Sequence, residues 1–444
     1  MNKKPRIVIT GTGAVCAAGR EPRAILDAVR AGRSAVGPIK QWDTSGWPTR
    51  VAGEIADFNP REMVEDRKLH KLIRRTDLLG LYAAARTIDA AGLTVYRDTL
   101  DAGAAAQYSD RTGVYVGSGG GNYDSQYDYF PLMTEAKDEL PEFGRELSNT
   151  VNPMWLLRTL PNNVLGHIGI RHGFKGSNAC ITNHSIGGTL AVIEAMEAIS
   201  NGEADRVVAV GHDAPIEPQM VLYYGDVGLL ASDSIRPFDR RHDGSLFGEG
   251  AAALALETES SAAERGAAVL GEVLGGGSAS DAQGLLAIRD DGDALARGIE
   301  LALADAGISP GDVGMIAAHG NGTPQSDTSE AVAIRRIFGK RAPPTTAFKW
   351  AFGHLIAAAG ILDTVLALRS LQEGVVPGVA TFESLDPLCE GVPISREPQR
   401  PRSDVALVLT GHFGNWEVAT IAALRASDKP RKTTNSPTSC QRCA

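Results

Sequence analysis

The chain has 444 residues, 43% of them hydrophobic and 22% charged, and its formal net charge at pH 7 is −9. This composition is that of an ordinary globular protein with more than one domain-sized unit. The acidic balance argues against nucleic-acid binding, although a local basic patch could still bind an acidic partner. With no signal segment and no apolar run of the ~18 residues that a membrane span needs, we expect a cytoplasmic protein without membrane contact.

The five cysteines are too scattered for a disulfide framework, which also favours a reducing cytoplasm. Cys440 and Cys443 form a C-x-x-C pair without a second pair of ligands, so no metal site is expected there. They lie in residues 427–444, a polar segment without apolar periodicity that we expect to be disordered.

Short apolar runs bounded by glycine or charged residues predict buried strands along the chain, and segments with helical spacing lie between them. The turn GTGAV after the first run lacks the third glycine of a dinucleotide-binding loop, because Cys16 stands there. The alternation predicts an α/β fold of two similar halves, residues 1–262 and 263–426. The runs that predict strands cover residues 6–10, 112–117, 206–214, 314–319 and 405–414.

The stretch 176–202 contains the first candidate nucleophile. A buried strand is expected to end near His184, and a helix with apolar periodicity is expected to begin near Ser185. Such a strand–turn–helix junction holds a side chain at the positive end of a helix dipole, although a serine there is often only an N-cap.

Two histidines and a lysine in the second half could complete a reactive site. His319 follows an apolar strand, while His354 lies on a glycine-rich turn five residues after Lys349. A hydroxyl, two imidazoles and an ammonium suit acyl transfer, with one histidine as the base. Each residue alone is more often structural, so the hypothesis depends on their meeting in space.

A basic cluster precedes a predicted helix near residue 77. It is either a solvated helix face or a docking site for an acidic carrier domain. Its members are Lys68, Lys71, Arg74 and Arg75.

Four segments resemble motifs of the β-ketoacyl-acyl carrier protein synthases, the elongating ketosynthases of the thiolase superfamily. The resemblance runs from residue 6 to about Ala426 and implies a layered α-β-α-β-α fold. It also implies an acyltransferase of fatty-acid or polyketide biosynthesis that needs no cofactor beyond the phosphopantetheine of an acyl carrier protein. The implied assembly is a homodimer, or a heterodimer with a paralogous ketosynthase subunit. The segments are residues 236–252, 317–331, 348–360 and 411–415.

The resemblance assigns a role to each matching residue. His319 and His354 match the histidines that polarise the thioester carbonyl and support decarboxylation of a malonyl extender. Lys349 matches a lysine that orders the surrounding network, and Glu330 matches the acid that accompanies it. Phe413 matches a gating residue whose backbone N–H, with that of the nucleophile, forms the oxyanion hole.

Two further positions, Thr323 and Asn321, match a pair of threonines that contact the phosphopantetheine arm, the second one being replaced by asparagine. The family docks its carrier protein where the basic cluster lies.

The important departure is at the nucleophile, where the family has cysteine. Counting back from the turn after the helix places Ser185 at that position, whereas Cys180 lies five residues too early and reads as a buried core thiol. A serine must lose its proton to a neutral histidine as it attacks. An acyl-serine ester is also a poorer electrophile toward a carbanion than a thioester is. Condensation is therefore disfavoured relative to acyl transfer.

Three hypotheses therefore stand. The first is an enzyme that forms acyl-Ser185 and then condenses it with malonyl carrier protein or passes it to another acceptor. The second is a malonyl-carrier-protein decarboxylase. The third is a non-catalytic partner subunit like the chain-length factors of type II polyketide synthases.

Overall fold

The computed structural model describes residues 4–120, 129–137, 139–284, 287–411 and 417–426. Ten of its strands form one mixed sheet in the order β10-β9-β11-β12-β8-β1-β7-β6-β4-β5, and β2 (Gly37–Pro38) pairs with β3 (Val51–Ala52). The strands of the large sheet are β1 (Ile7–Cys16), β4 (Thr112–Ser118), β5 (Asn178–Ile181), β6 (Arg206–Asp213), β7 (Gly250–Thr258), β8 (Gly271–Ser280), β9 (Met315–Ala317), β10 (Thr345–Thr346), β11 (Val405–Thr410) and β12 (Glu417–Ala426).

The sheet consists of two halves with the same topology. In the first half β4 pairs in parallel with β5 and β6, and β7 joins β6 to β1 by antiparallel pairing. In the second half β9 pairs in parallel with β10 and β11, and β12 joins β11 to β8 in the same way. Pairing between β1 and β8 connects the halves, so the predicted repeat is present in the strand order.

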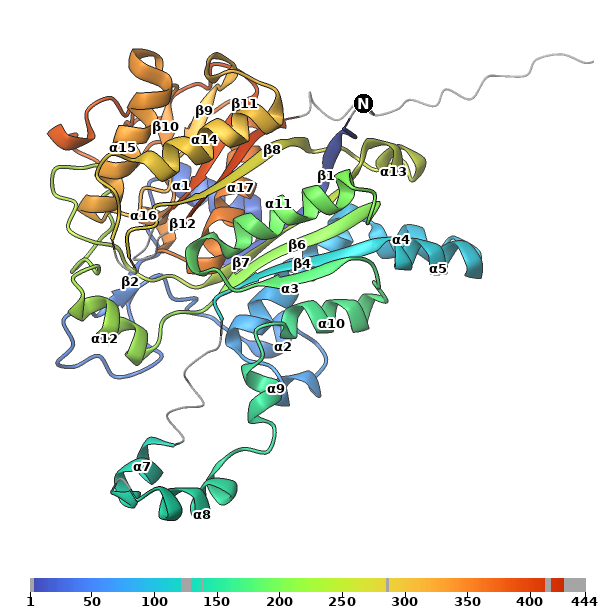
Figure 1. The fold of residues 1–444 in the computed structure, drawn as a ribbon, viewed down its shortest axis with the longest axis vertical. Helices are drawn as coiled ribbons and strands as arrows, with labels where there is room; N and C mark the ends of the chain where they lie inside the picture. The colour runs from blue at the N-terminus through green and yellow to red at the C-terminus, as the bar shows by residue number, and fades with distance from the viewer. Residues whose placement is uncertain (1–3, 121–128, 138, 285–286, 412–416, 427–444) are drawn as a thin grey trace, which may run out of the picture.

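Helices α11 (Gly187–Ser200) and α17 (Ala359–Gln372) lie between the two halves and contact strands of both. α3 (Arg75–Ala91) and α10 (Asn163–His172) cover the outer face of the first half, whereas α14 (Asp293–Ala306) covers that of the second and α15 (Pro324–Phe338) packs on α14. Figure 1 shows this layered arrangement. The predicted α-β-α-β-α core is therefore observed.

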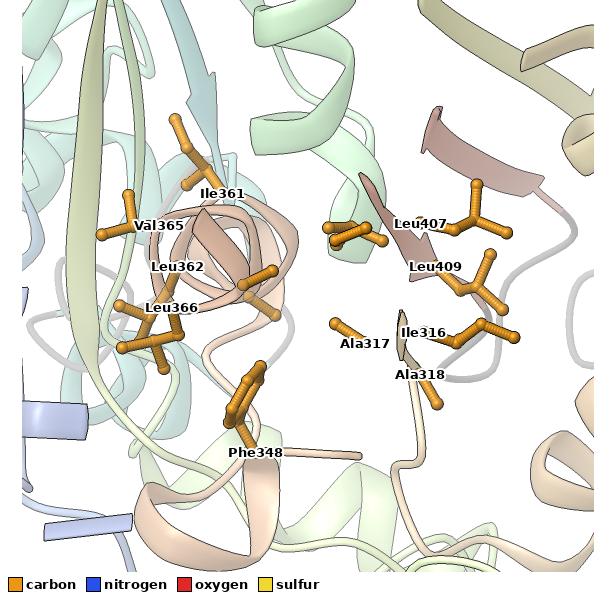
Figure 2. Packing of buried hydrophobic residues seen from close by; sticks show 14 of the residues in the cluster. Ile316, Ala317, Ala318, Phe348, Ile361, Leu362, Val365, Leu366, Leu407 and Leu409 are labelled. Carbon is orange, nitrogen blue, oxygen red and sulfur yellow. The ribbon is translucent and has the colours of Figure 1, made fainter. Parts of the chain in front are cut away.

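Strands in the middle of the sheet are apolar on both faces, so a buried cluster packs against each face. In β6, for example, Val207 and Ala209 pack toward α11, and Val208 and Val210 pack toward α3. On the other side, α17 residues such as Leu362 share one buried cluster with β9 and β11 (Figure 2). This burial on both faces explains why the strands read as unbroken apolar runs.

The turns before α11 and α17 are counterparts. Each helix follows a 3₁₀ turn, η2 (His184–Ile186) or η5 (Ile356–Ala358), whose first residue has a positive φ of 40° or 44°. The helices start in close contact: a Cβ added at Gly360 would lie 1.9 Å from Thr189 Oγ1. The repeat therefore brings two helix N-termini together at the centre of the molecule.

Shorter helices complete the fold, and α7 and α8 project from its body (Figure 1). No helix among the described residues is long and apolar enough to cross a membrane. The remaining helices are α1 (Pro22–Arg30), α2 (Pro60–Met63), α4 (Leu93–Arg97), α5 (Ala102–Asp110), α7 (Phe130–Ala136), α8 (Leu140–Thr150), α9 (Trp155–Thr159), α12 (Pro218–Asp226), α13 (Glu259–Glu264), α16 (Lys349–Phe352), η1 (Leu69–Lys71), η3 (Pro310–Asp312), η4 (Gly339–Arg341) and η6 (Pro387–Cys389).

The structure differs from the sequence predictions in two places. Residues 11–15, expected to form a turn, continue β1, and their glycines let α3 approach: a Cβ at Gly13 would lie 2.4 Å from Ala83 O. The strand before Ser185 is β5, which is a partly exposed edge strand rather than a buried one and ends at Ile181. The boundary at residue 262, which lies in α13, stays a prediction.

Candidate active site

Ser185 lies on η2, the short turn that leads directly into α11, and only 2% of its surface is exposed. Its hydroxyl donates a hydrogen bond of 2.9 Å to the backbone carbonyl oxygen of Gly411, just after β11. The start of α11 places the positive end of the helix dipole beside this turn. The sequence therefore placed Ser185 correctly at a helix start, and the structure adds the contact with the second half.

Cys180 is in a different environment. It lies on β5 and is half-buried, whereas a core thiol was expected. Its thiol donates to the carbonyl of Pro161 at 3.4 Å, and burial raises its pKa to about 11. The thiolate is the reactive form of cysteine, so this side chain is a poor nucleophile at neutral pH.

The two histidines meet next to Gly411. His319 follows β9, and a Cβ placed on Gly411 would lie 3.8 Å from its ring. The rings of His319 and His354 have centroids 5.1 Å apart, are nearly perpendicular, and are almost fully buried. The constellation expected from sequence therefore assembles, with Ser185 from the first half and both imidazoles from the second.

The protonation of His354 follows from its contacts. The backbone N–H of Ile356 donates to its Nδ1 at 2.9 Å, so this nitrogen carries a lone pair. Burial, and then electrostatic repulsion from Lys349 and from His319 and His184 when these are protonated, lowers the pKa of His354 well below its ordinary value. The ring is therefore neutral at pH 7 with its hydrogen on Nε2, which makes Nε2–H a hydrogen-bond donor.

Lys349 and Glu330 make separate contacts. Lys349 Nζ pairs with Asp363 Oδ2 at 2.8 Å, and both side chains have no exposed surface. Glu330 instead accepts backbone N–H bonds from His319 at 2.7 Å and Gly320 at 2.9 Å. Burial raises the pKa of Glu330 to about 8 despite these bonds. Glu330 therefore positions the His319 turn, and the carboxylate paired with Lys349 is Asp363.

Asn321 and Thr323 form a buried pair on the loop after His319. The backbone N–H and the hydroxyl of Thr323 both donate to Asn321 Oδ1, at 2.9 and 2.8 Å. Asp327 fixes the same loop by accepting from the N–H of Gly322 at 3.2 Å. The two predicted pantetheine-binding residues therefore lie beside His319 in a rigid loop.

Residues 236–252 support this site from behind. Asp327 Oδ2 accepts from the N–H of Phe238 at 2.7 Å and contacts His242 Nδ1 at 3.0 Å. Further along, His354 donates its N–H to the carbonyl of Leu246 at 2.7 Å and accepts from the N–H of Gly248 at 2.9 Å. The motif therefore holds both histidine loops.

The basic cluster is split by burial. Lys68 and Lys71 are exposed, whereas Arg74 is buried and Arg75 forms an ion pair with Glu249 at 2.5 Å. Among the residues that the structure describes, a docking surface at this position thus offers two exposed cations, Lys68 and Lys71, instead of the expected four. Phe413 and the tail with Cys440 and Cys443 lie outside the described residues.

Sequence reasoning missed two features of the site. Asp363 is an acidic residue inside the apolar helix α17, and that anomaly was the available signal. His184 precedes Ser185, and its Nε2 lies 2.6 Å from the hydroxyl oxygen of Tyr224 on α12. No local pattern connects these two residues.

Two family models match the chain. The model described as "Beta-ketoacyl synthase, N-terminal domain" matches residues 4–262, and "Beta-ketoacyl synthase, C-terminal domain" matches residues 270–383. The chain belongs to the β-ketoacyl synthase family. These matches include Ser185, both histidines and Lys349.

Relatives and solved structures agree with this assignment. The chain is 29% identical over 397 residues to "3-oxoacyl-[acyl-carrier-protein] synthase 2" of Staphylococcus aureus (strain COL), covering 88% of this chain and 91% of that protein. It is 30% identical over 388 residues to "Nodulation protein E" of Rhizobium sp. (strain N33), covering 87% and 90%. The structure of "The ishigamide ketosynthase/chain length factor" matches with a TM-score of 0.83 at 28% identity, covering 96% of this chain and 100% of that one.

These findings confirm the predicted family and its thiolase-like α/β fold. They also support the predicted class of activity, because the synthases among the relatives are acyl-transferring enzymes by name. The roles of individual residues stay predictions.

Proposed function

We propose that the chain is a ketosynthase-like acyltransferase of fatty-acid or polyketide biosynthesis that receives acyl groups from an acyl carrier protein on Ser185. The observation that carries the proposal is the convergence of Ser185, His319 and His354 at the N-terminus of α11. The membership of the β-ketoacyl synthase family supports it, as do relatives named for carrier-protein substrates.

In the first step Ser185 Oγ attacks the thioester carbon. An Oγ–carbon bond forms, the carbon–sulfur bond breaks, and the hydroxyl proton passes to the leaving sulfur. His319 is the better base for this transfer, because it adjoins the carbonyl that now receives the Ser185 hydroxyl, whereas His354 Nδ1 already accepts a backbone hydrogen bond and its Nε2 carries a hydrogen. The N-terminal N–H groups of α11 stabilise the oxyanion that forms.

In the second step the acyl group leaves Ser185. With malonyl carrier protein as extender, the Nε2–H of His354 binds the malonyl thioester oxygen while CO₂ departs, and the resulting carbanion attacks the acyl carbon. Since the acyl-serine ester is a weak electrophile, transfer to a stronger nucleophile competes with this condensation. Asn321 and Thr323 hold the phosphopantetheine arm beside His319.

Surface features support two protein partners. Lys68 and Lys71 offer a positive patch to an acidic carrier protein. The edge strand β5 and exposed apolar residues such as Leu156 and Ile170 suit a second ketosynthase subunit, identical or paralogous. A partner of this kind agrees with the name of one similar structure, which gives a ketosynthase together with a chain length factor.

A second candidate function is a non-catalytic partner subunit. The hydrogen bond from the Ser185 hydroxyl to the carbonyl of Gly411 favours it, because this bond gives Ser185 a structural role. It links the two halves of the fold whether or not the serine takes part in catalysis. A decarboxylase that uses only His319 and His354 is the third possibility.

Intact-mass measurement after incubation with acyl- and malonyl-carrier proteins separates these functions. We expect an acyl adduct on the unaltered chain and on the control Cys180→Ala, and none on Ser185→Ala. An unmodified chain that still releases CO₂ is a decarboxylase. An unmodified chain that releases none, and acts only beside a cysteine-bearing paralogue, is a partner subunit.

A further inference from the structure

A cavity of about 260 Å³ lies beside the turns that hold Ser185 and His354. His184 of η2 and Ile356 of η5 form part of its wall. His184 directly precedes Ser185, and the N–H of Ile356 is the group bonded to His354. The cavity is therefore bounded by the residue that precedes Ser185 on the turn.

The lining of the cavity combines apolar residues, such as Met220 and Ile356, with polar and acidic ones. Asp213, Glu217 and Gln219 line it together with the bonded pair His184 and Tyr224. Among the described residues of its wall there is no lysine or arginine. Ligand pockets are mostly apolar, with a few placed polar groups that fix orientation, so these groups indicate a polar ligand.

The polar groups are held in place before any ligand binds. The oxygens of Asp213 accept from the N–H groups of Ala214 at 2.8 Å and Ala357 at 3.3 Å. The Tyr224 ring stacks on His184 with an interplanar angle of 7° and packs edge-on against Phe247. Such fixed acceptors cost little further ordering when a ligand arrives.

The charge state of this wall favours a ligand that donates hydrogen bonds. Burial lowers the pKa of His184 to about 4, so the ring is neutral at pH 7 and adds no positive charge. Within the part of the chain that the structure describes, its Nδ1 makes no hydrogen bond. Burial raises the pKa of Asp213 to about 7, so this carboxyl is partly protonated near neutral pH. A carboxylate end group would still meet the acidic side chains of Asp213 and Glu217, and an alkyl end would leave His184 Nδ1 without a bond.

We propose that this cavity binds the far end of a short acyl chain that carries a hydrogen-bond donor, an amine or a hydroxyl. The inference rests on the proposed transfer of acyl groups to Ser185. The cavity volume is below the ~300–1,000 Å³ usual for small-molecule sites, which is why the chain is short.

The test uses six-carbon acyl thioesters of N-acetylcysteamine that end in an amine, a hydroxyl, a methyl or a carboxylate. The initial rate of Ser185 acylation is followed by intact mass. We expect the amine and hydroxyl ends to react about tenfold faster than the methyl end, and the carboxylate to be slowest, since one hydrogen bond to a buried group discriminates by about this much. His184→Ala and Tyr224→Phe should reduce the preference to less than twofold, and Leu222→Ala, an exposed neighbour on α12, should keep it.

The outcomes separate this inference from the proposed function. Acylation of Ser185 that is as fast with the methyl end as with donor ends overturns the inference and leaves the function standing. If no thioester acylates Ser185, the proposed function fails, and dissociation constants from calorimetry with the same four compounds decide about the cavity. A tenfold preference for donor ends then supports the inference, and equal affinities overturn it.

Discussion

The buried ion pair of Lys349 and Asp363 allows a quantitative prediction. Its atoms are 2.8 Å apart and neither side chain is exposed. At an effective dielectric constant of about 20, the Coulomb attraction is roughly 6 kcal/mol, most of which offsets the removal of both charges from water. Lys349→Met or Asp363→Leu alone leaves one buried charge and should cost about 3–5 kcal/mol of unfolding free energy.

The double variant Lys349→Met/Asp363→Leu should recover most of this loss, because it leaves no unpaired charge. With an unfolding entropy near 2.1 cal/mol/K per residue over the 444 residues, each single variant should melt about 4 °C lower. Chemical and thermal denaturation of all four proteins completes the cycle. Single variants that cost less than about 1 kcal/mol and add up in the double variant would refute the reasoning.

Three further predictions concern the site and its supports. Ser185→Cys should form the acyl adduct at least about tenfold faster than the unaltered chain, because a thiolate at a helix N-terminus needs no base; intact mass at equal times checks this, and an equal rate contradicts it. Glu330 has a raised pKa of about 8, so the unaltered chain loses stability as pH rises from about 4.5 to 8, by up to about 1.4 kcal/mol per pH unit. The free energy of unfolding of Glu330→Gln should therefore rise relative to that of the unaltered chain between pH 5.5 and 8.5, as measured by chemical denaturation. Parallel pH profiles of the two proteins would count against this. Gly360→Ala should cost about 2–3 kcal/mol because its Cβ would overlap Thr189, whereas Gly166→Ala, a helical control with open space, should stabilise by about 0.5–1 kcal/mol; equal denaturation midpoints for the two variants would contradict the crowding.

The sequence predicted those features whose physical cause lies within a short segment of the chain. Unbroken apolar runs predicted β4, β6 and β11, because strands covered on both faces have no polar side. The resemblance to the ketosynthases located Ser185, by counting back from the turn that closes the helix after it. The motifs around His319 and His354 gave the other two members of the site.

The features that were missed depend on contacts between distant segments. Lys349 on α16 pairs with Asp363 on α17, 14 residues further along the chain. His184 contacts Tyr224, which is 40 residues away in the sequence. Arg75 reads as a surface cation in the sequence, but it is neutralised by Glu249, 174 residues away. The glycines after residue 10 looked like a turn because nothing local shows that α3 approaches them.

The matched turns before α11 and α17 bear on how such a site arises and on what the chain needs to be active. Ala357 occupies in the second half the place that Ser185 has in the first, so one copy of the repeat supplies a hydroxyl and the other only a methyl group. The second copy supplies both imidazoles instead. Cutting the chain between β7 and β8 would separate the attacking atom from its base, so neither fragment could react by itself. Activity would return only when the two fragments reassemble, and it would then report directly on their association.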